Sequence, residues 1–165
     1  MKKVLILALC MLCILSGCKN GKVNDEQQKI YYGFKDALMN NGDLISSNIP
    51  FEYEILIEET KGKYLYTVIV KNPQVAMNNI QMMILNPEDA TKDIETATLG
   101  IYDETNYHMI PNQSNEKTGY YKELQLKGSS DHKDFKIHVT LAWKDSNQLI
   151  QYQVFFSFNV VDGKC

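Results

Sequence analysis

The chain has 165 residues and a formal net charge of −3, and all 17 of its basic residues are lysines. Because bidentate recognition of phosphate depends largely on the arginine guanidinium, an acidic chain without arginine is a poor candidate for nucleic-acid binding. Three of the four cysteines lie within the first 18 residues, so the rest of the chain holds one thiol, Cys165, and no internal disulfide.

The first 17 residues have the order of an export signal. Met1–Lys3 is short and basic, and the twelve residues Val4–Leu15 carry no charge. In a helix that rises about 1.5 Å per residue they reach about 18 Å, whereas a spanning helix needs roughly 20 residues. A basic segment, an apolar run and small residues before a cleavage point are typical of a secretory signal peptide. We expect residues 1–17 to be removed rather than to form a permanent transmembrane anchor.

The stretch Leu15-Ser16-Gly17-Cys18 resembles the lipobox of bacterial lipoproteins. The resemblance extends over the first 18 residues only, and it implies cleavage before Cys18 and a diacylglyceryl thioether on its sulfur. Two acyl chains anchor a protein stably where one binds marginally. We therefore expect a protein anchored in the cell membrane on its extracytoplasmic face, with 148 mature residues, 15 lysines and 20 acidic residues. The alternative is an ordinary signal peptide with an incidental cysteine.

The next segments predict a tether and a helix. Residues 18–24 are mostly polar and contain glycine, which predicts a short tether to the membrane. Residues 25–40 place Ile30, Phe34 and Leu38 at helical spacing, and Asn41-Gly42 is a helix stop signal. We assign residues 25–49 to one amphipathic helix and a connector, which ends before Pro50.

From residue 50 onward, apolar residues recur with a period of two, which predicts strands with one buried face. Strands are expected at 51–58, 63–71, 75–85, 98–102, 107–110, 120–127, 134–144 and 150–160, with a short helix at 87–93. We assign residues 50–165 to one mainly β domain, an immunoglobulin-like antiparallel β-sandwich with Trp143 as a core anchor. An eight-stranded barrel would have the same periodicity and remains the alternative.

The two last strands predict a long hairpin with a large apolar inner face. Its core-facing side chains are expected to be Phe135, Ile137, Val139, Leu141, Trp143, Ile150, Tyr152, Val154, Phe156, Phe158 and Val160.

Apolar residues also recur on the opposite strand faces, where a solvated sheet needs none. They are Leu56, Leu65, Ile69, Met83, Leu85 and Phe155. Because contiguous apolar patches are uncommon on monomers, something should cover this face. We expect the helix of residues 25–40 to dock there through Ile30, Phe34 and Leu38, and a partner protein is the alternative.

No catalytic pattern is present, so we expect neither an enzyme nor a cofactor. There is no Gly-x-Ser-x-Gly motif and no glycine-rich phosphate loop, and the one exported free thiol is terminal. The histidines His108, His132 and His138 lack the short spacings of a zinc site, and we expect them to be solvent-exposed and to bind no metal. The acidic residues between 88 and 95 lack the ligand alternation of a calcium loop.

The sequence thus favours a non-enzymatic binding module at the cell envelope. Loops on a rigid scaffold commonly carry binding residues, and the candidate loops here are 103–118 and 127–134. The candidate binding residues are Tyr107, His108, Asn112 and His132. The partner is expected to be a protein, matrix component or wall polymer of the envelope or surface. The alternative is an envelope lipoprotein that binds a small ligand or metal through the three histidines and Met77, Met82 and Met83.

Overall fold

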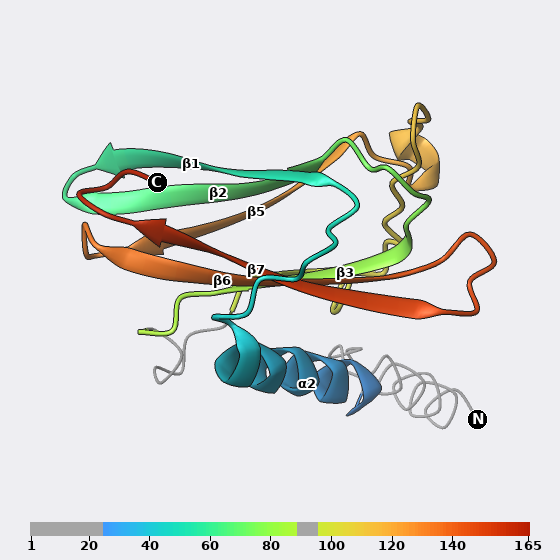
Figure 1. Ribbon diagram of the computed structural model, residues 1–165, viewed down its shortest axis with the longest axis horizontal. Helices are drawn as coiled ribbons and strands as arrows, with labels where there is room; N and C mark the ends of the chain where they lie inside the picture. The colour runs from blue at the N-terminus through green and yellow to red at the C-terminus, as the bar shows by residue number, and fades with distance from the viewer. Residues whose placement is uncertain (1–24, 89–95) are drawn as a thin grey trace, which may run out of the picture.

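A computed structural model describes residues 25–88 and 96–165 of the chain. Its elements, in chain order, are α2 (Asp25–Asn41), β1 (Glu52–Thr60), β2 (Lys63–Lys71), β3 (Asn78–Leu85), β4 (Thr98–Leu99), the 3-10 helix η2 (Glu116–Thr118), β5 (Glu123–Ser130), β6 (Phe135–Lys144) and β7 (Gln151–Val160) (Figure 1). The prediction of a mainly β domain preceded by one longer helix is confirmed.

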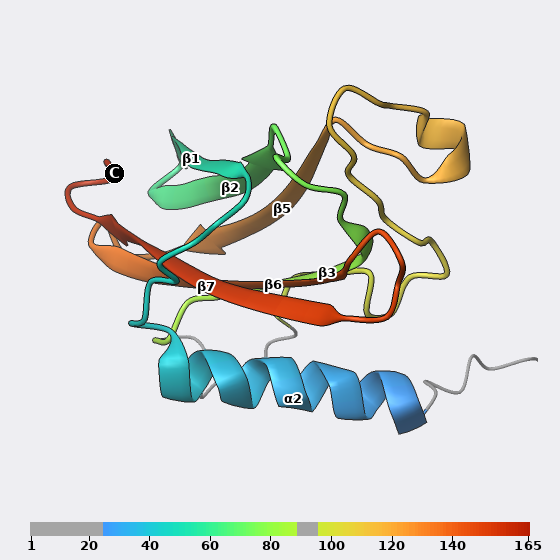
Figure 2. The ribbon, with the colours of Figure 1, turned by 45° about the vertical axis from the view of Figure 1, so that its right-hand side comes forward.

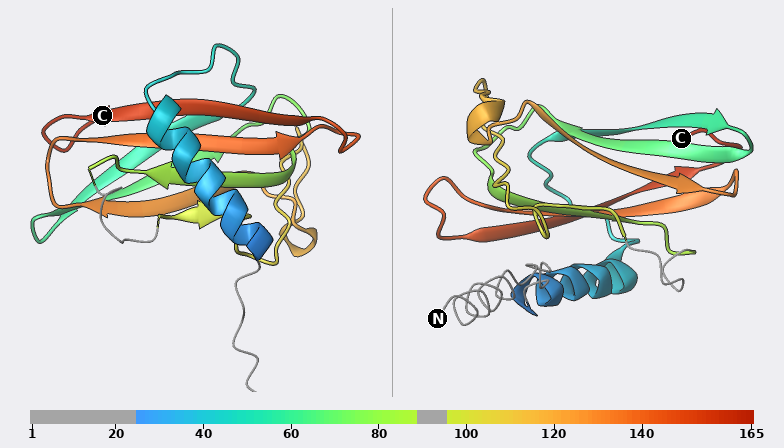
Figure 3. Two further views of the ribbon diagram at one scale, coloured as in Figure 1. Left: turned by 90° about the horizontal axis from the view of Figure 1, so that it is seen from below. Right: turned by 180° about the vertical axis from the view of Figure 1, so that it is seen from behind.

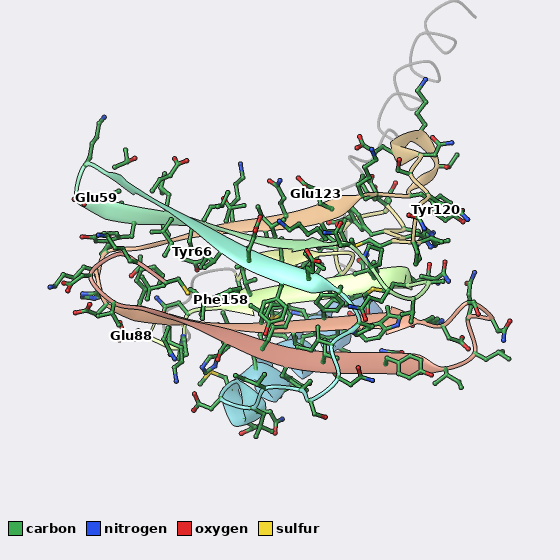
Figure 4. The ribbon with its side chains drawn as sticks, turned by 45° about the horizontal axis from the view of Figure 1, so that its top comes forward. Glu59, Tyr66, Glu88, Tyr120, Glu123 and Phe158 are labelled. Carbon is green, nitrogen blue, oxygen red and sulfur yellow. The ribbon has the colours of Figure 1, made fainter. Side chains whose placement is uncertain are left out.

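The strands form two separate antiparallel sheets rather than a closed barrel. One sheet has the order β1-β2-β5 and the other β4-β3-β6-β7, and they lie face to face in Figure 1. One apolar cluster fills the space between them, with Val68 and Leu124 from the first sheet and Val139 and Phe156 from the second. In Figure 4, Tyr66 and Phe158 lie between the two layers. Alternating apolar residues on both inner faces therefore build a single core.

Helix α2 covers the outer face of the four-stranded sheet (Figures 2 and 3). Its buried side chains Tyr31, Phe34 and Leu38 form a second cluster with residues of that sheet and of the segment after β4. The sheet residues in this cluster include Met83, Leu85, Ala142 and the partly buried Phe155. The predicted docking of this helix is thus confirmed for Met83, Leu85 and Phe155, three of the six outward-facing apolar residues.

The other half lies on the outer face of the β1-β2-β5 sheet, away from the helix. There Leu56 is 54% and Leu65 is 43% exposed. Ile69 is buried although it also faces outward, flanked in the sheet by Glu54 and Gln125. Long polar side chains can cover such a residue with their aliphatic stems while their heads stay in water.

Several predicted strand limits are wrong for local reasons. The third strand begins at Asn78 instead of residue 75, and its pairing with β6 is irregular between Asn78 and Gln81. Strand β4 has two residues because Gly100 adopts a φ of 72° and turns the chain. In the predicted strand 107–110, residues 108–110 form isolated bridges instead, and β5 begins three residues later than predicted. Most of the helix predicted at 87–93 lies outside the described residues.

The β6–β7 hairpin is as long as predicted, with ten cross-strand pairs. Trp143 is buried in the core cluster and meets Phe51 edge-on, with ring centroids 6.2 Å apart, so its role as a core anchor is confirmed. The prediction that Ile150 and Tyr152 face the core is wrong, since they are 55% and 46% exposed. The hairpin extends beyond the end of the β1-β2-β5 sheet (Figure 1). No strand of that sheet therefore lies opposite the inner face of the hairpin near its tip.

Candidate binding site beside the β6–β7 hairpin

A cleft of about 730 Å³ lies against the inner face of the hairpin, where the opposite sheet no longer covers it. The connector between α2 and β1 lines one side through residues 46–48 and 50, and Val75 and Ala76 of the β2–β3 loop line another. Its remaining lining comes from Trp143 at the end of β6, from Asp145 and Ser146 in the turn, and from the start of β7, including Tyr152. The volume falls in the range of ordinary ligand pockets.

Two stacked aromatic rings form the apolar part of the cleft. Trp143 and Tyr152 are direct cross-strand partners, and their rings stack at 5.4 Å with an interplanar angle of 19°. Val75, 44% exposed, adds an aliphatic side chain on the loop side. Hydroxyl and amide groups of Ser46, Ser47 and Gln153 also line the cleft. An apolar base with a few polar groups around it is the usual composition of a binding site for another molecule.

Beside the cleft, strand β7 forms one edge of its sheet. The connector bonds to this edge at one point, where the Ser46 N–H donates to the Phe155 carbonyl at 2.9 Å and the Phe155 N–H donates to Ser46 Oγ at 2.9 Å. Because a strand has a period of two, the backbone groups of Gln153 and Gln151 face the same edge. An exposed sheet edge of this kind can pair with an added extended segment.

Two of the sequence-predicted binding residues hold a loop in place. The Tyr107 carbonyl accepts the Ile80 N–H at 2.8 Å, and the Tyr107 ring lies 5.3 Å from the ring of Tyr121. His108 Nδ1 lies 2.9 Å from Asn78 Oδ1, and its imidazole stacks on Tyr120 at 4.9 Å. Burial lowers the pKa of His108, and it raises the pKa of Tyr107 with a smaller contribution from nearby Asp103. These contacts attach residues 107–121 to the start of β3.

Asn112 lies in the same loop but in a different pocket. It is exposed, with a φ of 61°, and lines a cleft of about 510 Å³ together with Asn72, Pro73 and Lys122 among others. The walls of this second cleft are mostly polar side chains and prolines, so the second cleft offers less apolar surface than the cleft beside the hairpin.

The structure does not bring the other predicted residues to this end. His132 is exposed in the turn between β5 and β6, at the opposite end of the sheets, where its N–H donates to Ser130 Oγ at 3.1 Å. His138 is 6% exposed beneath α2, with Nε2 3.6 Å from Asp43 Oδ1, so the expectation that it is solvent-exposed is wrong. Its burial lowers its pKa, which Asp43 partly opposes.

The residues considered for metal binding are likewise dispersed. Met77, Met82 and Met83 are fully buried within the two apolar clusters. Across residues 25–88 and 96–165, no three histidine, cysteine or acidic side chains are grouped in a way that could hold a metal ion.

Sequence patterns did not identify the cleft. Val75, Trp143 and Tyr152 were assigned to strands, because alternation identifies a face but not what lies opposite it. One signal was available: Ser146–Val161 contains no charged residue, and Leu149-Ile150 stands directly after a turn.

Comparisons with known proteins place the chain in no family. No protein-family model and no curated protein matches it. Among solved structures, the structural genomics target SoR45 matches at 14% identity, with a TM-score of 0.39 and coverage of 70% of this chain and 89% of that chain. A putative ApaA protein from Bordetella pertussis matches at 9% identity, with a TM-score of 0.38 and coverage of 68% and 94%. Likenesses this distant assign neither family nor function.

Within the described residues, no helix has both the length and the apolar character needed to cross a membrane.

Proposed function

We propose that this protein is an extracytoplasmic lipoprotein of the cell membrane that binds a partner and catalyses no reaction. The lipobox-like stretch Leu15-Ser16-Gly17-Cys18 supports the anchor, because it follows a basic segment and an uncharged run of signal-peptide length. These residues lie outside the described part of the chain. The diacylglyceryl group on Cys18 would hold the β domain at the extracytoplasmic face of the cell membrane.

The proposed ligand is an extended, partly apolar segment of another envelope protein. The observation that carries this proposal is the position of the apolar cleft directly beside the open edge of β7. A strand added at a sheet edge gains main-chain hydrogen bonds, and its alternate side chains gain specificity from adjacent pockets. Here Gln151 and Gln153 would offer the backbone groups, and the exposed ring of Tyr152, which stacks on the buried Trp143, would receive an apolar side chain.

We also propose that the two sheets form an immunoglobulin-like sandwich. In the seven-stranded form of such folds the first, second, fifth and fourth strands share one sheet, and the third, sixth and seventh share the other; here β4 instead pairs with β3 in the second sheet. The orders β1-β2-β5 and β4-β3-β6-β7 agree with this rule except for β4, a short edge strand. Binding at loops clustered on one end of the sandwich is common in this architecture.

A Cys18→Ser substitution tests the anchor. We expect the variant to keep its signal peptide and to carry no lipid, as read from the mass of its N-terminal peptide. If the variant still fractionates with membranes at mature size, the lipoprotein proposal fails.

Photo-crosslinking in cells tests the cleft. We expect a crosslinking residue at position 153, on the open edge of β7, to capture one defined protein. A Tyr152→Ala or Val75→Asp substitution should abolish that product, whereas Leu65→Asp, at an equally exposed apolar residue on another face, should not. Loss of the product in all three variants, or in none, would contradict binding at the cleft.

A further inference from the structure

The tip of the β6–β7 hairpin exposes apolar side chains at the end of the molecule. Leu149 is 84% and Ile150 is 55% exposed, and Tyr152 lies just below them at 46%. Asp145 is the last charged residue before the tip, and none follows until Asp162. An exposed pair of aliphatic residues above an amphipathic tyrosine is the composition that favours a membrane interface.

Hydrogen bonds within the hairpin hold part of the backbone of the tip. Asp145 Oδ1 accepts the N–H groups of Leu149 and Ile150 at 2.8 and 3.2 Å. The Asp145 N–H donates to the Ile150 carbonyl at 3.0 Å, and the Gln148 N–H donates to the Asp145 carbonyl at 2.9 Å. Unpaired backbone groups are costly in a medium of low polarity, and these hydrogen bonds reduce their number at the tip.

The opposite end of the sheets has a different character. Its β1–β2 turn contains Lys61, and Lys63 at the start of β2 pairs with Asp131 of the β5–β6 turn at 3.1 Å. Lys133 of the same turn pairs with Asp162. These ion pairs suit an aqueous surface, whereas the hairpin carries no charged side chain between Asp145 and Asp162.

The N-terminal end of helix α2 lies toward the hairpin end of the molecule. The C-terminal end of the helix adjoins the start of β6, since a methyl group on Gly42 would lie 1.7 Å from His138 Nδ1. Its N-terminal end therefore points toward the end of the molecule that carries the hairpin, as Figures 1 and 2 show. Seven residues, 18–24, connect this end to the proposed lipid, and a chain of that length spans at most about 25 Å.

We propose that the hairpin tip, through Leu149 and Ile150, inserts into the interfacial region of the lipid bilayer as a second membrane contact beside the acyl anchor. The inference rests on the proposed lipidation of Cys18 and deepens it, because it assigns an orientation to the domain. The long axis of the domain then points away from the membrane, and the β1–β2 and β5–β6 turns lie farthest from it. The cleft beside the hairpin opens close to the bilayer surface, where a partner that is itself membrane-bound can reach it.

A fluorescent label at the tip tests the contact in the lipidated protein. Asn147, exposed in the turn, is changed to Cys in a Cys165→Ser background, so that the native Leu149 and Ile150 remain. The labelled protein is reconstituted in vesicles of phosphatidylcholine and phosphatidylglycerol that contain a spin-labelled lipid. A matched label at Glu59, near the opposite end in Figure 4, is the control. The mass of the N-terminal peptide reports lipidation separately.

We expect the lipid-borne quencher to reduce the fluorescence of the label at 147 and to leave the label at 59 unchanged. Adding Leu149→Asp and Ile150→Asp should remove the quenching at 147 while the protein stays lipidated and bound. Equal responses at both positions, or quenching that survives the two aspartates, would overturn the inference and leave the lipoprotein proposal intact. A label at 147 that is shielded from aqueous iodide but not quenched by lipid would mean that a protein covers the tip, and would also overturn it. A chain without lipid on Cys18 overturns the proposed function and this orientation together.

Discussion

Replacing Leu38 with alanine tests the docking of α2 on the sheet. Leu38 is fully buried between the helix and the four-stranded sheet, in the cluster that contains Met83, Leu85 and Ala142. Core Leu→Ala substitutions cost about 2–5 kcal/mol, and the cost depends on how far the surroundings can collapse. The strands beneath Leu38 are held by a continuous hydrogen-bonded ladder, so little collapse is available. We expect a loss of about 3 kcal/mol in the free energy of unfolding.

Urea unfolding of the purified protein measures this loss with two probes. Trp143, the only tryptophan, reports the sheets, and far-ultraviolet circular dichroism reports the helix. The matched control is Met39→Ala, the next residue in the same helix, because Met39 is 49% exposed. An exposed substitution should change the stability by about 0.5 kcal/mol or less. A Leu38→Ala effect no larger than that of the control would refute the packing argument, and separate transitions by the two probes would show that α2 unfolds independently of the sheets.

Three further outcomes follow from local geometry. Gly100→Ala should lower the free energy of unfolding by about 1–3 kcal/mol or more, because alanine is strained at a φ of 72° and its methyl group would lie 2.1 Å from the Ile80 carbonyl oxygen. The control is Gly62→Ala, where φ is 78° but the added methyl group meets no neighbour, and an equal loss in both variants would contradict the steric explanation. Acidification should destabilise the fold as the pH falls below about 6.5, because burial depresses the pKa values of His138 and His108 and the unfolded chain binds these protons more readily. Thermal unfolding of His138→Leu, which cannot titrate at that position, should show a weaker dependence, and an unchanged dependence would exclude His138 as a source. Asp145→Ala removes the acceptor for two backbone amides of the hairpin tip, so it should lower the free energy of unfolding by about 1 kcal/mol and speed amide hydrogen exchange at Leu149 and Ile150. Unchanged exchange would show that the carboxylate does not order the tip.

The elements that depend on local spacing could be predicted from the sequence. Helix α2 and strand β2 occupy the expected residues, since a stop signal at Asn41-Gly42 and a turn at Lys61-Gly62 border them. The expected docking of the helix through Phe34 and Leu38 also holds. Strand β4 was overestimated because the positive φ of Gly100 is set by its close approach to Ile80, a residue twenty positions earlier.

The candidate site was less accessible to sequence reasoning. Tyr107 and His108 had the polar and aromatic character of binding residues, but their partners Asn78, Ile80 and Tyr121 lie in other segments, and these contacts make them supports for the loop. His138 alternates with core residues and was therefore placed in solvent, yet α2 lies over that face and buries it. In both cases the environment of the side chain depends on an element that local periodicity does not describe.

The amino-acid sequence alone determined the mainly β character of this protein, the helix that precedes the β domain and the lipobox-like N-terminus from which the anchor is proposed. Each of these depends on residue type and on spacing within one segment. Tertiary structure decided which strands share a sheet and where the facing sheet ends relative to the β6–β7 hairpin. That difference in length leaves Leu149, Ile150 and Tyr152 uncovered and opens the cleft beside Trp143. Alternation defines the face of a strand, but burial depends on what packs against that face.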